Sequence, residues 1–203
     1  MKKISSGAEA IIYQNKDKVT KHRISKSYRH PELDKKIIKR RTKAETKILT
    51  KTSEIIPSPK PEEQKEHDKI IMPFIEGDKL STNLDNYPQD KQEKIMFELG
   101  KTIAKLHKED IIHGDLTTSN MIYSESKIFI IDFGLGFQNG KYEDKGVDIH
   151  LLKQALEAKH FKAWEILFKE FEVGYRSMQS KPEEAQKVFD RMKAIEKRGR
   201  YRH

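Results

Sequence analysis

Two short motifs at a fixed separation constrain the fold of this chain more than any other feature of its sequence. The first is His113-Gly114-Asp115-Leu116-Thr117-Thr118-Ser119-Asn120, and Asp132-Phe133-Gly134 begins twelve residues after its asparagine. The residues between them predict a tight hairpin, with strands at 121–123 and 127–131 around a Ser124-Glu125-Ser126 turn. A chain with this order brings oxygen-bearing side chains from a loop and a hairpin into one small volume.

Those side chains suit a divalent cation that carries phosphate. Mg²⁺ prefers hard oxygen ligands and keeps substrate phosphates in its shell, so we expect Asn120 and Asp132 to hold the metal. Asp115 then faces the attacking hydroxyl or water, which it orients or deprotonates. Either motif alone is more often a loop cap or an ordinary turn, but the pair in this order favours a phosphoryl-transfer site.

A lysine and a glutamate are expected to complete the charged part of this site. Lys21, at the end of a predicted strand, can reach phosphate oxygens, and Glu45 on a long predicted helix can hold its ammonium group in an ion pair. Glu45 lies one helical turn from Ile48 and Leu49, so it borders the expected buried face. Most glutamates on lysine-rich helices pair only with surface lysines, so this prediction depends on the other motifs.

Two further segments predict the walls of an ATP cleft. Small residues allow backbone N–H groups to approach phosphate closely, and serines add hydroxyl donors. The segment with this character is Ser5, Ser6, Gly7, Ala8, Glu9 and Ala10, which alone would be read as a hairpin turn. At the opposite wall Met72, Pro73 and Ile75 form a predicted hinge, where the Pro73 carbonyl accepts from the adenine amino group and the Ile75 N–H donates.

The remaining pattern predicts an α+β protein with a small β-rich lobe, residues 1–76, and a mainly helical lobe, residues 77–203. Helical and strand periodicities define the elements. They are a hairpin over 10–21, a helix from Pro31 with Leu33, Ile37, Ala44 and Ile48 on one face, a strand over 67–74, a helix from Pro88 to about His107, and three C-terminal helices marked by Leu152, Phe171 and Met192. Residues 197–203 are expected to form a frayed basic tail.

Composition narrows the chemistry further. The absence of cysteine excludes disulfides, thiolate zinc sites and cysteine nucleophiles. The longest apolar stretch, Ile70 to Ile75, contains a proline and falls far short of the roughly 18 residues of a membrane helix, so we expect a cytoplasmic protein with no membrane association. The net charge of +9 favours polyanionic partners such as nucleotides or RNA, although a solvated lysine-rich surface gives the same value.

The order of these motifs resembles that of a minimal protein kinase. The stretch from Lys21 to Asp34 (KHRISKSYRHPELD), with Arg40-Arg41-Thr42 and Glu45, is similar to the kinase subunit of the KEOPS (EKC) complex, which is related to the RIO-type atypical kinases. Gly146-Val147-Asp148 and Arg198-Gly199-Arg200 match the same family, so the resemblance spans nearly the whole chain.

This resemblance implies a bilobal kinase-like fold that uses ATP and Mg²⁺. It also implies service in the complex that makes threonylcarbamoyladenosine in tRNA, by ATP hydrolysis or autophosphorylation on Ser/Thr. The expected partners are an ASKHA-fold threonylcarbamoyltransferase subunit, a small subunit on the N-lobe, and tRNA through the complex. In some archaea the transferase and kinase share one polypeptide, so the chain is expected to be either a separate subunit or a domain of such a fusion.

Departures from ordinary protein kinases restrict this expectation. Gly114 replaces the arginine of the His-Arg-Asp motif, the first turn has one glycine where three are usual, and no Ala-Pro-Glu sequence ends an activation segment. Hydrolysis or self-modification is therefore favoured over broad phosphorylation of proteins.

Two alternatives remain open at this point. Small-molecule phosphotransferases of the aminoglycoside or choline kinase type also carry His-Gly-Asp with an asparagine five residues after the aspartate, although their acceptor pockets need helical insertions. A non-enzymatic RNA-binding scaffold is indicated by the basic runs 39–43 and 197–202.

Overall fold

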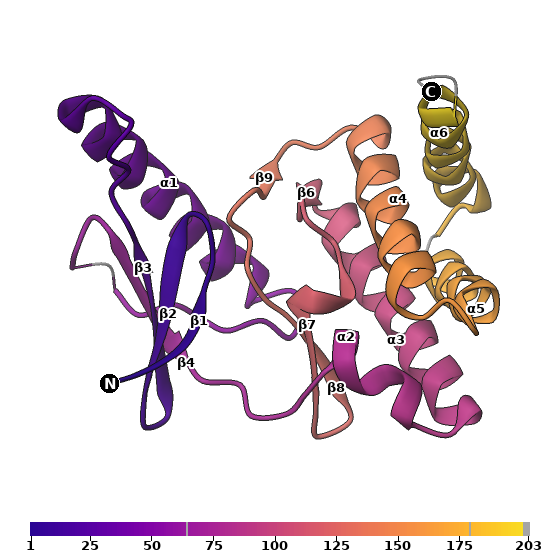
Figure 1. Cartoon of the computed structure of the whole chain (residues 1–203). Helices are drawn as coiled ribbons and strands as arrows, with labels where there is room; N and C mark the ends of the chain where they lie inside the picture. The colour runs from indigo at the N-terminus through magenta and orange to yellow at the C-terminus, as the bar shows by residue number, and fades with distance from the viewer. Residues whose placement is uncertain (64, 179, 201–203) are drawn as a thin grey trace.

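Two lobes lie side by side in the computed structural model, which describes residues 1–63, 65–178 and 180–200 (Figure 1). The N-lobe contains β1 (Lys2–Ser6), β2 (Ala10–Asn15), β3 (Lys18–Arg23), α1 (Pro31–Thr52) and β4 (Lys69–Pro73). The C-lobe contains β5 (Asp78–Lys79), α2 (Leu80–Asn83), η1 (Leu84–Asn86), α3 (Gln89–Lys108), β6 (Ile111–Ile112), η2 (Thr118–Asn120), β7 (Met121–Ser124), β8 (Lys127–Ile130), β9 (Phe137–Gln138), α4 (Tyr142–Lys159), α5 (Trp164–Ser177) and α6 (Pro182–Arg200). The predicted α+β, bilobal kinase-like fold is confirmed.

The N-lobe sheet is antiparallel in the order β1-β2-β3-β4. The predicted hairpin over 10–21 is confirmed as β2 and β3, which turn at Lys16-Asp17, where Lys16 adopts a φ of 55°. The register pairs Lys18 with Pro73 at one end of β3 and Arg23 with Ala10 at the other. Because alternate residues of a strand share a face, Lys21 and Arg23 lie on the same side of β3.

Helix α1 starts at Pro31, as predicted, with a proline and acidic residues in its first turn. Its buried face is more polar than the apolar spacing suggested: Asp34, Thr42, Glu45, Ile48, Leu49 and Thr52. The expected core positions Leu33 and Ala44 were wrong, since Leu33 is 54% exposed and Ala44 is also exposed. Buried charged side chains with partners from β3 and the adjoining loop occupy the face that the pattern assigned to apolar residues.

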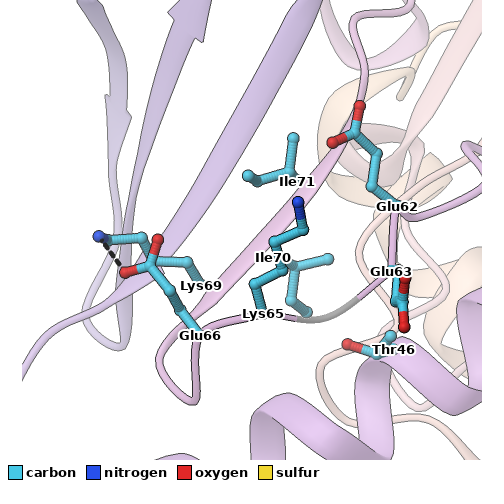
Figure 2. Close-up of a pocket in the computed structure, with 8 residues that line it drawn as sticks. All are labelled: Thr46, Glu62, Glu63, Lys65, Glu66, Lys69, Ile70 and Ile71. Carbon is cyan, nitrogen blue, oxygen red and sulfur yellow. Dashed lines mark hydrogen bonds and ion pairs between the residues drawn. The ribbon is translucent and has the colours of Figure 1, made fainter.

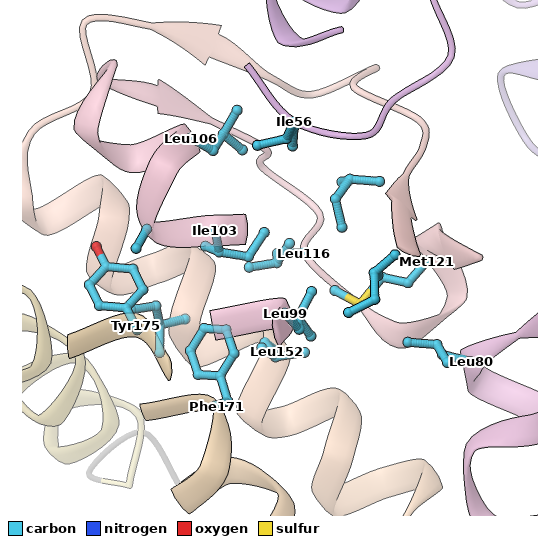
Figure 3. Close-up of a cluster of buried hydrophobic side chains, with 14 of the residues drawn as sticks. Ile56, Leu80, Leu99, Ile103, Leu106, Leu116, Met121, Leu152, Phe171 and Tyr175 are labelled. Carbon is cyan, nitrogen blue, oxygen red and sulfur yellow. The ribbon is translucent and has the colours of Figure 1, made fainter. Parts of the chain in front are cut away.

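The core of the C-lobe gathers apolar side chains from α3, α4, α5 and the β7–β8 hairpin (Figure 3). Helices α3 and α5 approach each other closely because Gly100 and Gly174 lie at their crossing. A Cβ at Gly174 would come within 2.0 Å of the Phe97 carbonyl oxygen, so this position admits no side chain without separating the helices. Ile56, which follows α1, packs into the same core, and the Ile130 N–H donates to the Pro57 carbonyl at 3.0 Å.

The predicted hairpin between the two motifs is confirmed as β7 and β8. Its two-residue turn, Glu125-Ser126, has positive φ at both positions, as hairpins with matched strand twist require. The short strands β6 and β9 form a separate pair, so the segment after Asp132 returns along the segment before Gly114.

The C-terminal prediction was partly wrong. Helix α6 continues to Arg200, so residues 197–200 are helical and not a frayed tail; residues 201–203 lie outside the described part. α6 packs on α4, and Arg198 donates to Glu143 at 2.8 Å, which favours the helical extension. No helix in the described part of the chain combines the length and apolar character needed to cross a bilayer.

Candidate active site

The predicted lysine and glutamate meet between the lobes. Lys21 Nζ donates to Glu45 Oε1 at 2.7 Å and to Asp132 Oδ1 at 2.6 Å. The Lys21 and Glu45 side chains are 7% and 1% exposed, whereas that of Asp132 is half exposed. One ammonium group therefore links β3, α1 and the Asp-Phe-Gly segment.

Lys21 also controls the ionisation of Asp132. Burial of this carboxyl disfavours its charge, but the nearby charge of Lys21 and its hydrogen bond outweigh that effect, so the pKa of Asp132 is lowered from 3.8. The Gly134 N–H donates to the same oxygen and acts in the same direction. Asp132 is thus anionic at neutral pH, as a metal-binding carboxylate must be.

The loop between β6 and β7 carries Asp115 and Asn120 together. Asn120 Nδ2 donates to both the backbone carbonyl and Oδ2 of Asp115, each at 2.9 Å. The Asn120 carbonyl accepts from the Ile131 N–H at 3.0 Å, which fixes this loop beside the strand that delivers Asp132. The structure therefore places the catalytic-loop pair next to the second motif, as the spacing predicted.

Asp148 on α4 holds this loop from behind. Its fully buried carboxylate accepts from the His113 N–H at 2.7 Å and from the Gly114 N–H at 2.8 Å, and it lies 3.3 Å from His107 Nε2. Tyr175 bonds the other nitrogen of His107, and burial, with a contribution from the charge of Asp148, raises the pKa of this tyrosine. From the sequence, Asp148 was noted only as a match to the family; its anchoring role comes from the structure.

Gly114 has a geometric reason to be glycine. Its φ is 79°, and a Cβ there would lie 2.5 Å from the Leu135 carbonyl oxygen. Positive φ and close approach of another backbone both favour glycine. The segment after Asp132 thus occupies the space that a side chain at position 114 would need.

Eight of the predicted site residues line one cleft of ≈ 300 Å³. Its lining is Ser5, Gly7, Ala8, Glu9, Ala10, Ile12, Lys21, Arg23, Arg41, Asp115, Asp132, Gly134 and Leu135. Glu45 lies buried behind Lys21. Other predicted site residues do not line this cleft within the described residues: Ser6, Met72, Pro73, Ile75 and Asn120. Met72 is buried in the sheet and Pro73 is exposed at its edge, so the adenine contacts remain a prediction.

The predicted phosphate-binding wall of the cleft, residues 5–10, is called the lid below, and basic side chains hold it. Glu9 accepts from Arg41 at 2.8 Å and lies 3.5 Å from Arg29, and Lys26 donates to the Ala8 carbonyl. The Gly7 N–H donates to the Ala10 carbonyl at 2.9 Å and closes the turn. These contacts hold the lid over the cleft and neutralise the single acidic group in it.

The donor set fits a magnesium ion that also binds phosphate. Asn120 turns its amide nitrogen to Asp115, and its amide oxygen accepts no hydrogen bond from the described residues. No cluster of three or more histidine or acidic side chains suited to a metal occurs in the described residues. One carboxylate and one amide oxygen leave most coordination positions to phosphate and water, which is the arrangement Mg²⁺ favours.

The sequence reading missed one buried residue of the cleft, Arg23. This side chain is 5% exposed and donates from NH2 to Glu45 Oε2 at 2.5 Å. The strand alternation could have revealed it, since Arg23 is two residues from Lys21. A positive side chain next to a predicted phosphate-binding lysine is the signal that was overlooked.

A second hollow lies beside β4 and the segment before it (Figure 2). Thr46, Ile70 and Ile71 form part of its lining together with acidic and lysine side chains, and Lys69 pairs with Glu66 at 2.5 Å. At ≈ 20 Å³ it has room for about one water molecule, so it is not a nucleotide site.

Comparisons with known proteins identify a family for this chain. The model of the RIO domain family matches residues 3–140. The chain is 40% identical to the KEOPS complex subunit Bud32 of Pyrococcus abyssi, over 100% of this chain and 97% of that protein. It is 38% identical to a probable serine/threonine-protein kinase BUD32 homolog of Archaeoglobus fulgidus, over 98% and 96% of the two chains.

One relative is much longer than this chain. A probable bifunctional tRNA threonylcarbamoyladenosine biosynthesis protein of Methanobrevibacter smithii is 38% identical over 98% of this chain, which spans only 37% of that protein. Among solved structures, the bifunctional kinase-methyltransferase WbdD superposes with a TM-score of 0.56 at 17% identity, over 91% of this chain and 47% of that one. The latter similarity concerns the fold alone.

Proposed function

Because this chain belongs to the Bud32 family of RIO-domain proteins, we propose that it is an ATP-dependent serine/threonine kinase or ATPase of the KEOPS complex. Its activity would support the synthesis of threonylcarbamoyladenosine in tRNA. The names of the relatives support this assignment: they include a KEOPS subunit, a probable serine/threonine kinase and a tRNA threonylcarbamoyladenosine biosynthesis protein.

The observation that carries the proposal is the convergence of three charged groups on one cleft. Lys21, Asp115 and Asp132 all line it, although they come from β3, the β6–β7 loop and the segment after β8. A structural ion pair would explain Lys21 with Asp132, but it would not explain an exposed aspartate held by an asparagine at the same cleft. A nucleoside triphosphate accounts for all three.

Each group has a distinct task in phosphoryl transfer. An oxygen of water, or of a serine or threonine of the protein itself, forms a bond to the terminal phosphorus while the bond to the bridging oxygen breaks. Asp115 takes the proton of the attacking group, and ADP leaves with the electron pair of the broken bond. Lys21 binds inner phosphate oxygens and orients the chain of phosphates.

Magnesium would be held by Asn120 and Asp132, where it would supply positive charge against the phosphate oxygens. Asn120 donates two hydrogen bonds to Asp115, and its carbonyl accepts from the N–H of Ile131, the residue before Asp132. The lid residues Ser5 and Ser6, with backbone N–H groups near Gly7, would cover the phosphates, and Met72, Pro73 and Ile75 would receive the adenine.

The proposed partners follow the family. They are the ASKHA-fold threonylcarbamoyltransferase subunit, which the kinase would regulate, a small subunit on the N-lobe, and tRNA bound through the complex. The placement of the lobe boundary at residues 76–77 and a cytoplasmic location belong to the same proposal. The small-molecule phosphotransferase and the RNA-binding scaffold are not favoured, since the relatives are named as a KEOPS complex subunit and a probable serine/threonine-protein kinase.

ATP hydrolysis by the full chain tests the proposal, measured alone and then with the transferase subunit and tRNA. Asp115→Ala should lower turnover by about 100-fold or more, the usual contribution of a general base. Asp90→Ala, an exposed aspartate at the start of α3, should leave it unchanged. Unchanged turnover in a folded Asp115→Ala variant would show that the catalytic carboxylate is another residue. Stimulation only in the complete mixture would support regulation through the transferase.

A further inference from the structure

The side chain of Arg23 is buried at the cleft, and its one hydrogen bond to a described residue is to Glu45. Its NH2 donates to Glu45, but its Nε, shielded from solvent, has no hydrogen-bond partner among the described residues. Arginine carries five N–H donors, and buried donors without partners cost free energy. Since Arg23 lines the cleft, its spare donor capacity indicates a group that is absent from the protein itself.

The position of Arg23 on β3 identifies the part of the cleft that it serves. β3 runs from Lys18, which pairs with Pro73 at the hinge, to Arg23, which pairs with Ala10 beside the lid. Lys21 lies between them, about 7 Å from Arg23 along the strand at 3.3 Å per residue. A nucleotide whose base lies at the hinge would therefore meet Lys21 before Arg23.

The charged groups of Asp132, Lys21 and Arg23 surround one point beside Gly134. A Cβ built on Gly134 would lie 3.0 Å from Asp132 Oδ1, 3.4 Å from Lys21 Nζ and 3.7 Å from Arg23 NH2. Gly134 lacks that atom and lines the cleft, so the space beside it is accessible to a ligand. A tetrahedral group with several oxygens can accept from a lysine and an arginine that face the same space.

We propose that Arg23 binds the terminal phosphate of the nucleotide, and so makes the cleft selective for a nucleoside triphosphate over a diphosphate. This inference rests on the proposed function. Lys21 is already shared between Glu45 and Asp132, whereas Arg23 has N–H donors to spare. Its shared contact with Glu45 keeps the guanidinium fixed while the unpaired donors meet the phosphate.

Calorimetric binding of ATP and of ADP, each with Mg²⁺, to the full chain tests the inference without any turnover. Arg23→Lys keeps a positive charge for Glu45 but removes Nε and the planar fork, and Arg23→Met removes all donors. We expect either variant to weaken the binding of ATP about 10- to 100-fold, the usual effect of losing a hydrogen bond to a charged group. The binding of ADP should weaken by less than about threefold. Arg40→Met, an exposed arginine outside the cleft lining, is the matched control for loss of charge.

Three results would overturn the inference. If the binding of ATP and of ADP weakened equally, Arg23 would act only by holding Glu45 and Lys21. If the binding of ATP did not weaken, Arg23 would not contact phosphate. If the unaltered chain bound neither nucleotide, the proposed function would fail as well. This third result concerns the unaltered chain, whereas the first two concern only the Arg23 variants, so the two kinds of failure are distinguishable. Should Arg23→Met not fold, as judged by circular dichroism, Arg23→Lys decides the question.

Discussion

Replacing Asp148 by alanine should destabilise the protein and disorganise its active site. The carboxylate accepts two backbone N–H groups, those of His113 at 2.7 Å and Gly114 at 2.8 Å, and is itself completely buried. Each donor left without a partner costs about 1–3 kcal/mol, so the free energy of unfolding should fall by about 2–6 kcal/mol. The free energy of unfolding of a typical domain is only about 5–15 kcal/mol.

Asp148→Asn should have an intermediate effect, because its single amide oxygen can accept only some of the hydrogen bonds that the carboxylate accepts. The free energy of unfolding should fall by about 1–3 kcal/mol. Glu157→Ala removes a carboxylate of the same helix whose pair with Lys153, at 3.6 Å, is partly exposed, and should cost at most about 1 kcal/mol. Urea unfolding followed by circular dichroism measures all three variants, and ATP turnover reports the displacement of Asp115. If Asp148→Ala stays within about 1 kcal/mol of the unaltered chain, the carboxylate does not anchor the loop.

Three other substitutions, one of them with a matched control, test separate features. Gly114→Ala should lower both the melting temperature and ATP turnover, whereas Gly7→Ala, where only ordinary contacts surround an added Cβ, should leave the melting temperature nearly unchanged. Gly174→Ala should reduce stability to urea by about 1–3 kcal/mol, because the added methyl group forces the α3–α5 crossing apart. Lys21→Met should raise the pKa of Asp132, measured by carbon NMR titration of its carboxyl group; an unchanged value would contradict the ion pair. In the unaltered chain the pKa of Asp132 lies below 3.8, so the stabilisation from this pair is complete above about pH 4 and is lost as the pH falls through the lowered value.

The sequence predicted the parts of the fold that depend on local rules. Helical spacing, the proline at Pro31 and the turn chemistry at 125–126 act within a few residues, so α1 and the β7–β8 hairpin could be placed from the chain alone. The convergence of Lys21 on Asp132, 111 positions apart, followed from motif order and not from local periodicity.

The errors have a common physical cause. Apolar spacing put Leu33 in the core, but the buried face of α1 takes Asp34 instead, because Ser25 and Arg29 donate to its carboxylate. Hydrophobic periodicity cannot detect a charge that is buried with partners from another segment. The same cause explains the error at residues 197–200. Arg198 of α6 pairs with Glu143 of α4, and the sequence of α6 alone does not reveal that partner.

The departure of the catalytic loop from ordinary protein kinases also has a structural consequence. The space an arginine would need at Gly114 is taken by the Leu135 backbone, and β9 follows almost at once and pairs with β6. Asp148 fixes the loop through backbone N–H groups, so its order does not require a phosphorylated activation segment. Control of the cleft must then act elsewhere. The exposed turn of the lid, residues 7–9, is attached mainly by side chains, chiefly Arg41 to Glu9, with one backbone hydrogen bond from the Ile24 N–H to the Glu9 carbonyl. Loss of the Arg41 side chain would remove the shorter of the two ion pairs of Glu9 without altering the loop that carries Asp115.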